Sequence, residues 1–158
     1  MPLASIRVLV ADGFKPWRHS LRSMLKRQAK LQLVGAVADG VEAVQKASEL
    51  KPDLILLAID LPKLNGIEVA KRIRQAVPDA KIVFLSIESD ADMVQAALNS
   101  GGQGYVLKTD AGSELLPAIE AVLQGKQYVS RGLARQTQTN RTIRFIGSRL
   151  ASTPSAAR

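Results

Sequence analysis

The 158-residue sequence contains no cysteine, no long apolar run and no recognisable secretory signal. Without cysteine, disulfide bonds and thiolate metal sites are excluded, and this composition fits a protein of the cytoplasm. No uninterrupted stretch of about 18 apolar residues is present, so the sequence predicts no membrane-spanning helix. The first residues, MPLASIRVLVADG, lead directly into a predicted strand and lack a charged start and a cleavage site. These absences predict a cytoplasmic protein that does not contact a membrane.

Sequence motifs for nucleotide binding and catalysis are also missing. There is no G-x-x-x-x-G-K-S/T loop and no G-x-G-x-x-G after a strand, and the GGQG at residues 101–104 precedes a predicted strand, which indicates a turn. No cluster of histidine, cysteine and carboxylate residues offers a transition-metal site. The only histidine, His19, has no serine or aspartate at triad spacing and is predicted to be a surface or rim residue. We therefore expect no enzymatic activity and no cofactor.

Acidic residues are absent from the C-terminal part of the chain. Residues 126–158 contain Lys126 and six arginines without any acid, a balance of +7, whereas residues 1–125 contain 15 Lys+Arg and 14 Asp+Glu, a balance of +1. The net charge of +8 therefore resides mainly in the tail. Such asymmetry indicates a solvated extension that can bind anions. We expect a globular domain over residues 1–130 and a basic, partly disordered tail over residues 131–158.

Short apolar segments alternate along the chain with segments of helical period. The apolar segments are mostly apolar at successive positions, which predicts strands covered on both faces and hence a parallel sheet. The predicted strands are Ile6–Ala11, Gln32–Ala38, Leu54–Ile59, Ile82–Ile87 and Gly104–Leu107. Between the first two, Trp17, Leu21, Met24 and Leu25 fall at i, i+4, i+7 and i+8 on one helical face. This alternation predicts a (βα)₅ fold, a doubly wound α/β sandwich of three layers.

Ligands of doubly wound sheets bind beyond the carboxyl ends of the strands, where the strand order reverses. The residues that the sequence places at these ends are Asp12–Gly13, Ala58–Asp60, Ser86 and Lys108. They form the candidate site. Near the same edge, Asp90 and Ser113 are predicted to cap the helices that follow the fourth and fifth strands, since both residue types favour that position.

Three segments together resemble a known family. They are VLVADG at residues 8–13, DLILLAIDLPKLNG at residues 53–66 and SGGQGYVLK at residues 100–108. In this order and spacing they resemble the receiver domain of bacterial response regulators, and most of all the receivers of the NarL/LuxR type, over residues 5–130. The resemblance implies a flavodoxin/CheY-like fold with strand order 2-1-3-4-5, ending near Gln127. It also implies a role in two-component or phosphorelay signalling.

The residue at the family's phosphorylation position is an alanine. In the family, the third strand ends on an aspartate that accepts a phosphoryl group from a histidine kinase, and the resemblance places Ala58 there. Two acids after the first strand hold Mg²⁺ in the family, and the matching residues are Asp12 and Gly13. Because two of the three carboxylates are missing, we expect Mg²⁺ binding to be weak or absent. Asp60 is an alternative acceptor, but its side chain is expected to point away, and the family uses a backbone carbonyl at this position.

Other residues of the family's switch are present. Ser86 matches the hydroxyl that binds the phosphoryl group, and Lys108 matches the lysine that pairs with acceptor and phosphate. Tyr105 matches the aromatic residue whose rotamer reports the state of that hydroxyl. Without an acceptor, we expect Lys108 to form a structural ion pair with Asp12, because a partly buried lysine needs an anion nearby. The alternatives are that Ser86 is a plain polar strand end and that Asp12 is only a strand-end cap.

The expected function is regulatory. Receivers of the NarL type usually precede a DNA-binding helix-turn-helix domain, but only 24 residues follow Ala134, too few for that domain. We expect a non-enzymatic pseudo-receiver that contacts a protein partner or a second copy through residues 90–125, independently of phosphorylation. The alternative is a nucleic-acid-associated regulator whose receiver dimerises and whose tail binds phosphates. Its basic residues would include Arg141, Arg144 and Arg149, on one short amphipathic helix or on a solvated remnant of a linker.

Overall fold

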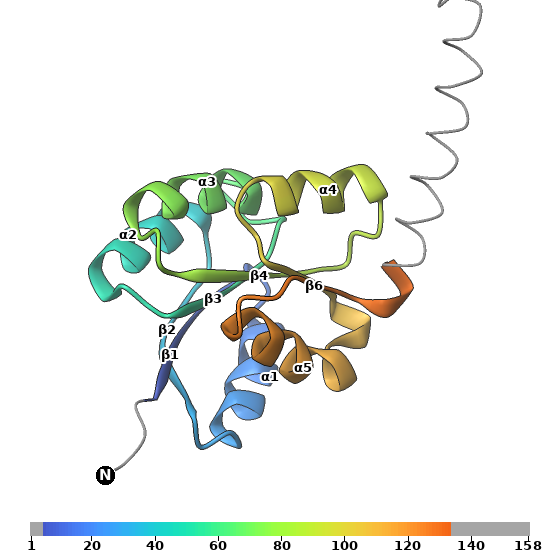
Figure 1. Ribbon diagram of the computed structural model, residues 1–158. Helices are drawn as coiled ribbons and strands as arrows, with labels where there is room; N and C mark the ends of the chain where they lie inside the picture. Colours follow the sequence, from blue (N-terminus) through green and yellow to red (C-terminus); the bar gives the residue numbers. More distant parts are fainter. Residues whose placement is uncertain (1–4, 134–158) are drawn as a thin grey trace, which may run out of the picture.

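A six-stranded parallel sheet forms the centre of the computed structural model, which describes residues 5–133 (Figure 1). The strands are β1 (Ile6–Ala11), β2 (Leu31–Val37), β3 (Leu54–Leu57), β4 (Lys81–Ser86), β5 (Gly104–Leu107) and β6 (Tyr128–Val129). Their order across the sheet is β2-β1-β3-β4-β5-β6. The predicted order of the first five strands is confirmed. The prediction of a five-stranded domain that ends near Gln127 is wrong, because β6 adds a sixth strand at the edge of the sheet.

Helices cover both faces of the sheet. They are α1 (Lys15–Lys26), α2 (Gly40–Leu50), α3 (Gly66–Ala76), α4 (Ala91–Asn99) and α5 (Ala111–Leu123), with a 3₁₀ turn, η1 (Lys108–Asp110), before α5. Figure 1 shows α2, α3 and α4 on one face of the sheet and α1 and α5 on the other. This is the predicted three-layer arrangement. Within residues 5–133, no helix is long and apolar enough to cross a membrane.

The strands direct their side chains alternately into two cores. In β1, Leu9 and Ala11 join the core with α2, α3 and α4, whereas Val8 and Val10 join the core with α1 and α5. Successive residues of a strand point to opposite faces, so a central strand covered on both sides is apolar throughout. β3 has the sequence LILL, and all four of its residues are buried. The unbroken apolar segments of the sequence therefore correspond to strands with helices on both sides.

Side-chain caps fix where three of the helices begin. Asp39, Asn65 and Asp90 each accept a hydrogen bond from a backbone N–H in the first turn of α2, α3 and α4, respectively. These caps satisfy N–H groups that a helix leaves without a partner. The prediction of a cap at Ser113 is wrong. Because η1 runs directly into α5, that helix begins at Ala111, and the Ser113 hydroxyl donates instead to a carbonyl oxygen of η1 at 3.3 Å.

The segment that follows α5 is fixed to the edge of the sheet by contacts around Glu114. The carboxylate of Glu114 is buried, and its Oε1 accepts hydrogen bonds from the Tyr128 hydroxyl at 2.7 Å and from the Arg131 N–H at 3.0 Å. The Ser130 hydroxyl accepts a hydrogen bond from the Leu107 N–H at 2.9 Å. A strand of two residues has no period that a sequence pattern can reveal, so β6 depends on these contacts with residues far away in the chain.

Replacing Glu114 with alanine is expected to loosen β6 and to lower the free energy of unfolding by about 1–3 kcal/mol, because two hydrogen bonds lose their acceptor. Hydrogen exchange of the Ser130 amide, which is bonded to the Tyr105 carbonyl, should become faster. Urea unfolding gives the change in stability. Glu120→Ala, at an exposed position of the same helix, is the matched control and should change neither quantity appreciably. Equal effects of the two substitutions would contradict the anchoring role of Glu114.

Candidate functional site

A cavity of about 640 Å³ opens at the carboxyl ends of β1, β3 and β4, beside the start of η1. Its lining contains the four groups expected from the sequence, namely Asp12–Gly13, Ala58–Asp60, Ser86 and Lys108. Much of the remaining wall is apolar and comprises Phe14, Trp17, Leu61, Pro62, Leu85 and Ile87, and Glu88 completes it. The parallel sheet brings residues from four separate strand ends together at one edge, as such topology predicts.

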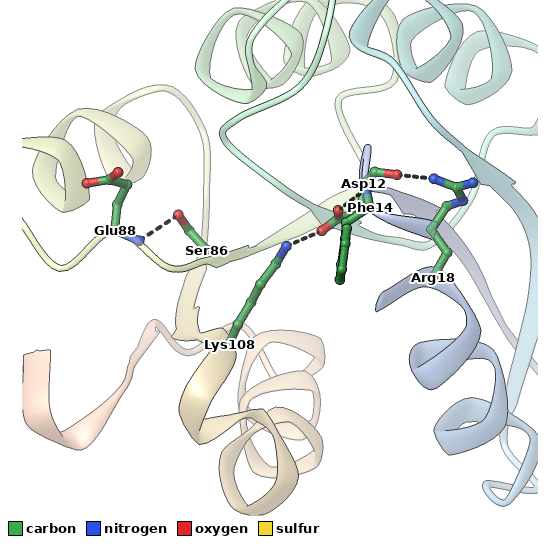
Figure 2. Close-up of polar contacts among 6 residues, drawn as sticks. All are labelled: Asp12, Phe14, Arg18, Ser86, Glu88 and Lys108. Atoms are coloured by element: carbon green, nitrogen blue, oxygen red, sulfur yellow. Dashed lines mark hydrogen bonds and ion pairs between the residues drawn. The ribbon is translucent and has the colours of Figure 1, made fainter. Parts of the chain in front are cut away.

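Asp12 and Lys108 form a largely buried ion pair in the wall of this cavity (Figure 2). Asp12 Oδ2 lies 2.7 Å from Lys108 Nζ, and the two side chains are 5% and 19% exposed. The other carboxylate oxygen, Oδ1, accepts a hydrogen bond from the Phe14 N–H at 2.8 Å. Within the described residues, Oδ2 has no hydrogen-bond partner beyond this ion pair. Lys108 therefore supplies the charge that balances a buried carboxylate, in the arrangement expected from the sequence.

Helix α1 contributes one contact to the Lys108 ammonium of this ion pair and one to the backbone of Asp12. The ammonium of Lys108 lies 5.3 Å from the ring centroid of Trp17, a distance typical of a cation–π interaction. The guanidinium of Arg18 donates a hydrogen bond to the backbone carbonyl of Asp12 at 2.7 Å. Sequence reasoning had placed Trp17 only on the apolar stripe of α1. No signal in the sequence pairs it with Lys108, because the contact depends on how α1 packs beside the start of η1.

A second polar arrangement joins the loop after β4 to β5. The Ser86 hydroxyl accepts a hydrogen bond from the Glu88 N–H at 3.0 Å (Figure 2), and the Tyr105 hydroxyl donates to the Glu88 carbonyl at 2.8 Å. Tyr105 is fully buried and stacks on Phe84 with ring centroids 6.2 Å apart. Burial raises the pKa of the Tyr105 hydroxyl above its ordinary value of 10.0, so it keeps the proton that it donates. The side chains of Ser86 and Tyr105 thus both bind the backbone of Glu88, in the loop after β4.

The cavity does not contain a cluster of carboxylates. Ala58, directly after β3, is 4% exposed, whereas Asp60 is exposed. A side chain at Gly13 would place its Cβ only 3.1 Å from Cδ of Pro62. Within residues 5–133, no group of three or more histidine or carboxylate residues could hold a metal ion. The side chains at this site therefore do not fit a Mg²⁺ site of three converging carboxylates.

Other residues singled out in the sequence lie away from the cavity. His19 is exposed on α1 and lines a different hollow, in keeping with the surface position predicted for it. Arg141, Arg144 and Arg149 lie outside the described residues, so the structure does not bear on the predictions made for them.

The predicted contact surface, residues 90–125, is partly covered by the chain itself. β6 pairs with the edge of β5, and Leu133 is buried in the same core as Val94. Met93 and Leu98 of α4 are only partly buried. The parts of this surface that residues 5–133 leave open to a partner therefore lie on α4 and α5, and the edge of β5 is not among them.

The fold and the position of the cavity define a doubly wound α/β domain with its site at the strand ends. The sequence model of the response regulator receiver domain matches residues 8–120, and the chain belongs to this family. It is 32% identical over 124 residues to the transcriptional regulatory protein DegU of Brevibacillus brevis, covering 78% of this chain and 52% of DegU. It is 34% identical over 131 residues to the response regulator GacA of Pseudomonas viridiflava, covering 83% of this chain and 61% of GacA.

The same likeness extends to solved structures. A crystal structure of a LuxR-family two-component response regulator from Aurantimonas sp. SI85-9A1 has a TM-score of 0.84 at 29% identity, covering 88% of this chain and 99% of that one. The response regulator domain of CheB from Thermotoga maritima has a TM-score of 0.71 at 33% identity, covering 76% and 97%. These likenesses confirm the predicted CheY-like fold. Because the chain spans only 52% and 61% of DegU and GacA, the activities of those whole proteins do not follow from the match.

Proposed function

We propose that this chain is a receiver domain that acts without phosphorylation, through contact with a protein partner or with a second copy of itself. The observation that supports this function most directly is the position of Ala58. It follows β3 and lines the cavity together with Asp12, Ser86 and Lys108, which match the residues of the family's phosphorylation pocket. A methyl group cannot accept a phosphoryl group. The pocket thus keeps groups suited to bind a phosphoryl group but lacks the one that would carry it.

The carboxylates that remain are poor substitutes for the missing acceptor. Asp12 is held by the Lys108 ammonium and by the Phe14 N–H, so its charge is already compensated. Asp60 is exposed to solvent, and Gly13 has no side chain with which to ligate a metal. Mg²⁺ prefers an octahedron of oxygen ligands. We therefore infer that Mg²⁺ binds weakly at most and that no aspartyl phosphate forms.

The contacts of Ser86 and Tyr105 support a switch that is held in one state. Both hydroxyls bond to the backbone of Glu88, one accepting from its N–H and one donating to its carbonyl. The loop between β4 and α4 is thereby attached to β5. Because α4 begins directly after this loop, its position is also fixed, and the surface that it presents does not depend on a phosphorylation event.

We assign this regulatory role to the folded domain. It was expected over residues 1–130 but extends at least to Leu133, which is buried in its core, so the basic tail that was expected over residues 131–158 begins after that residue. The contact surface for a partner would lie on the open parts of α4 and α5. Met93 and Leu98 are partly buried there and could contribute apolar area, while the neighbouring side chains Asp92 and Asn99 are exposed. Interfaces of signalling complexes are frequently small, so a weak and reversible contact is expected.

Incubation of the full chain with acetyl phosphate and Mg²⁺ is expected to leave its intact mass unchanged, because Ala58 has no carboxylate. Light scattering on the same samples should give one association state before and after incubation, since the contact surface does not depend on phosphorylation. A stable gain of one phosphoryl group that disappears in Asp60→Asn would contradict the proposal. A change of association state caused by acetyl phosphate would contradict it as well.

Two variants serve as matched controls for this experiment. Ala58→Asp alone should gain little phosphoryl group, because Gly13 still leaves the metal short of one ligand. Ala58→Asp combined with Gly13→Asp supplies both carboxylates, although the new side chain at position 13 must displace Pro62 slightly. Phosphorylation of the double variant would establish that donor and metal are effective under the conditions used. Efficient phosphorylation of the single variant would mean that Gly13 does not limit the metal site.

A further inference from the structure

Helix α1 carries a row of basic side chains on its exposed face. The row, called the basic stripe below, consists of Lys15, Arg18, His19, Arg22 and Lys26. Positions 15, 18, 22 and 26 are spaced by three or four residues, and position 19 is four residues after 15 and three before 22. Residues at this spacing lie on one side of a helix. Leu21 and Leu25, on an adjoining side of the helix, are buried in the core. Lys15, His19, Arg22 and Lys26 are exposed, whereas Arg18 is half-buried and donates one hydrogen bond to the Asp12 carbonyl. The exposed members follow a helix of 12 residues, about 18 Å long.

No acidic side chain neutralises the basic stripe. Helix α1 contains no aspartate or glutamate, and none of the ion pairs within residues 5–133 involves a residue of the stripe. Like charges four residues apart, as in the pairs Arg18–Arg22 and Arg22–Lys26, repel each other on a helix. Lys15 and Arg18 also oppose the positive end of the helix dipole. Lys26, in the last turn, is favourable to the dipole. The repulsion among the other cations costs the isolated helix stability, and a bound polyanion would relieve it.

Four residues of the stripe surround a hollow between α1 and the end of β2. The hollow has a volume of about 480 Å³, and it is lined by Lys15, Arg18, His19, Arg22 and Ala36. It shares no lining residue with the larger cavity at the strand ends. Its lining contains three cationic side chains and an imidazole but no carboxylate. A hollow of this kind is suited to an anion that presents several oxygen acceptors.

We propose that the basic stripe of α1 binds the phosphodiester backbone of a nucleic acid. Three of its cations surround a hollow, and Lys26 extends the row by a further turn. A rigid row of cations matches a polymer whose negative charge repeats along its length, and such contacts need no base recognition. This site belongs to the folded domain and is distinct from the basic tail. It also goes beyond the regulatory contact proposed for α4 and α5, since it uses residues of α1 alone, although α5 packs on the same face of the sheet as α1.

Lipid surfaces and short acidic peptides fit the stripe less well. A helix that lies on a membrane turns an apolar face toward the lipid, but the apolar face of α1 is buried through Leu21 and Leu25. Between Lys15 and Lys26 no large apolar side chain is exposed, and the exposed Phe14 directly before the helix is a single side chain and not an apolar face. The +7 charge of residues 126–158 has the same sign as the stripe, so a long polyanion could engage both, whereas a short peptide could not. These features favour a nucleic acid.

The test measures binding of the full-length chain to a short labelled DNA duplex by fluorescence anisotropy over a range of salt concentrations. Arg22→Gln/Lys26→Gln is expected to lower affinity at least about tenfold at about 0.1 M salt. It should also reduce the slope of log K against log salt by about 2, because two phosphate contacts are lost. The substitutions remove exposed, mutually repelling charges, so the urea midpoint should not fall.

The matched control is Lys71→Gln/Arg74→Gln, which removes the same charge from exposed positions of α3 on the other face of the sheet (Figure 1). It should change affinity by no more than about twofold. If the two double variants bind alike, the effect is one of net charge and the proposed site does not exist. The proposal is also overturned if the unmodified chain fails to bind DNA at about 0.1 M salt, or if it binds phosphatidylserine vesicles but not DNA.

Discussion

Replacing Gly66 with alanine is expected to lower the free energy of unfolding by about 3 kcal/mol or more, because a side chain there collides with backbone. A Cβ at this position would lie 2.0 Å from the carbonyl oxygen of Ala58 and 2.8 Å from Cα of Ile59. The N–H of Gly66 donates to the Ile59 carbonyl at 2.7 Å, so α3 cannot move away without losing this bond. Gly66 therefore determines how closely α3 approaches Ala58 and Ile59, which follow β3 and line the site. Urea unfolding measures the loss.

Gly112→Ala is the matched control for this substitution. Gly112 is an exposed residue of α5, and a Cβ there would meet no atom within 4 Å. Because alanine restricts the unfolded chain and favours a helix, we expect a gain of about 0.5 kcal/mol. If Gly66→Ala lowers the free energy of unfolding while Gly112→Ala raises it, the loss at Gly66 is due to close packing and not to alanine itself. If Gly66→Ala were as stable as Gly112→Ala, the contact between α3 and the end of β3 would not be as close as described.

The ends of the strands show how far the apolar pattern predicts the fold. The predicted Ile6–Ala11 and Gly104–Leu107 coincide with β1 and β5. The predicted Leu54–Ile59 is two residues too long, since β3 ends at Leu57. The carbonyl of Ile59 accepts hydrogen bonds from two N–H groups of the following loop, at Leu61 and at the first residue of α3. Apolar composition continues to Ile59, but its backbone bonds already belong to the turn, which no apolar pattern can reveal.

The composition of the site was predictable from topology, but many of its contacts were not. Parallel strands bring their carboxyl ends to one edge, so Asp12, Ser86 and Lys108 could be placed together from the sequence. The interaction of Trp17 with Lys108 and the bonds from Tyr105 to the loop after β4 depend on packing between distant segments. Such contacts have no fixed spacing in the chain. They become visible only when the positions of the elements are known.

The net charge of residues 1–125 does not reveal the basic stripe of α1, because it sums the charges of the whole segment. Residues 1–125 have a net charge of only +1, because the acids elsewhere in this range offset the cations of α1. A helical projection of residues 15–26 separates the stripe from the apolar positions, since both repeat with the period of the helix. The net charge of a whole segment therefore did not predict the distribution of charge on its surface.

Replacing Lys108 with methionine is expected to lower the free energy of unfolding by about 3 kcal/mol, because it leaves the Asp12 carboxylate buried without its counterion. The side chain of Asp12 is 5% exposed, and Oδ2 has no other partner among the described residues. Methionine preserves most of the packing against Trp17, so the lost charge rather than a cavity should account for the change. Urea unfolding of both proteins measures the difference, and circular dichroism verifies that the fold is retained.

The double variant Asp12→Asn/Lys108→Met separates the ion pair from other effects of the substitution. Asparagine keeps an oxygen that can accept the Phe14 N–H but removes the buried charge, so most of the lost stability should return. The exposed pair Lys46–Glu49, with atoms 3.3 Å apart and side chains 45% and 52% exposed, is the matched surface control. Lys46→Met should change stability by less than about 1 kcal/mol. If Lys108→Met were equally mild, Asp12 would have to be solvated in the folded protein, and the ion pair could not be what holds the walls of the cavity together.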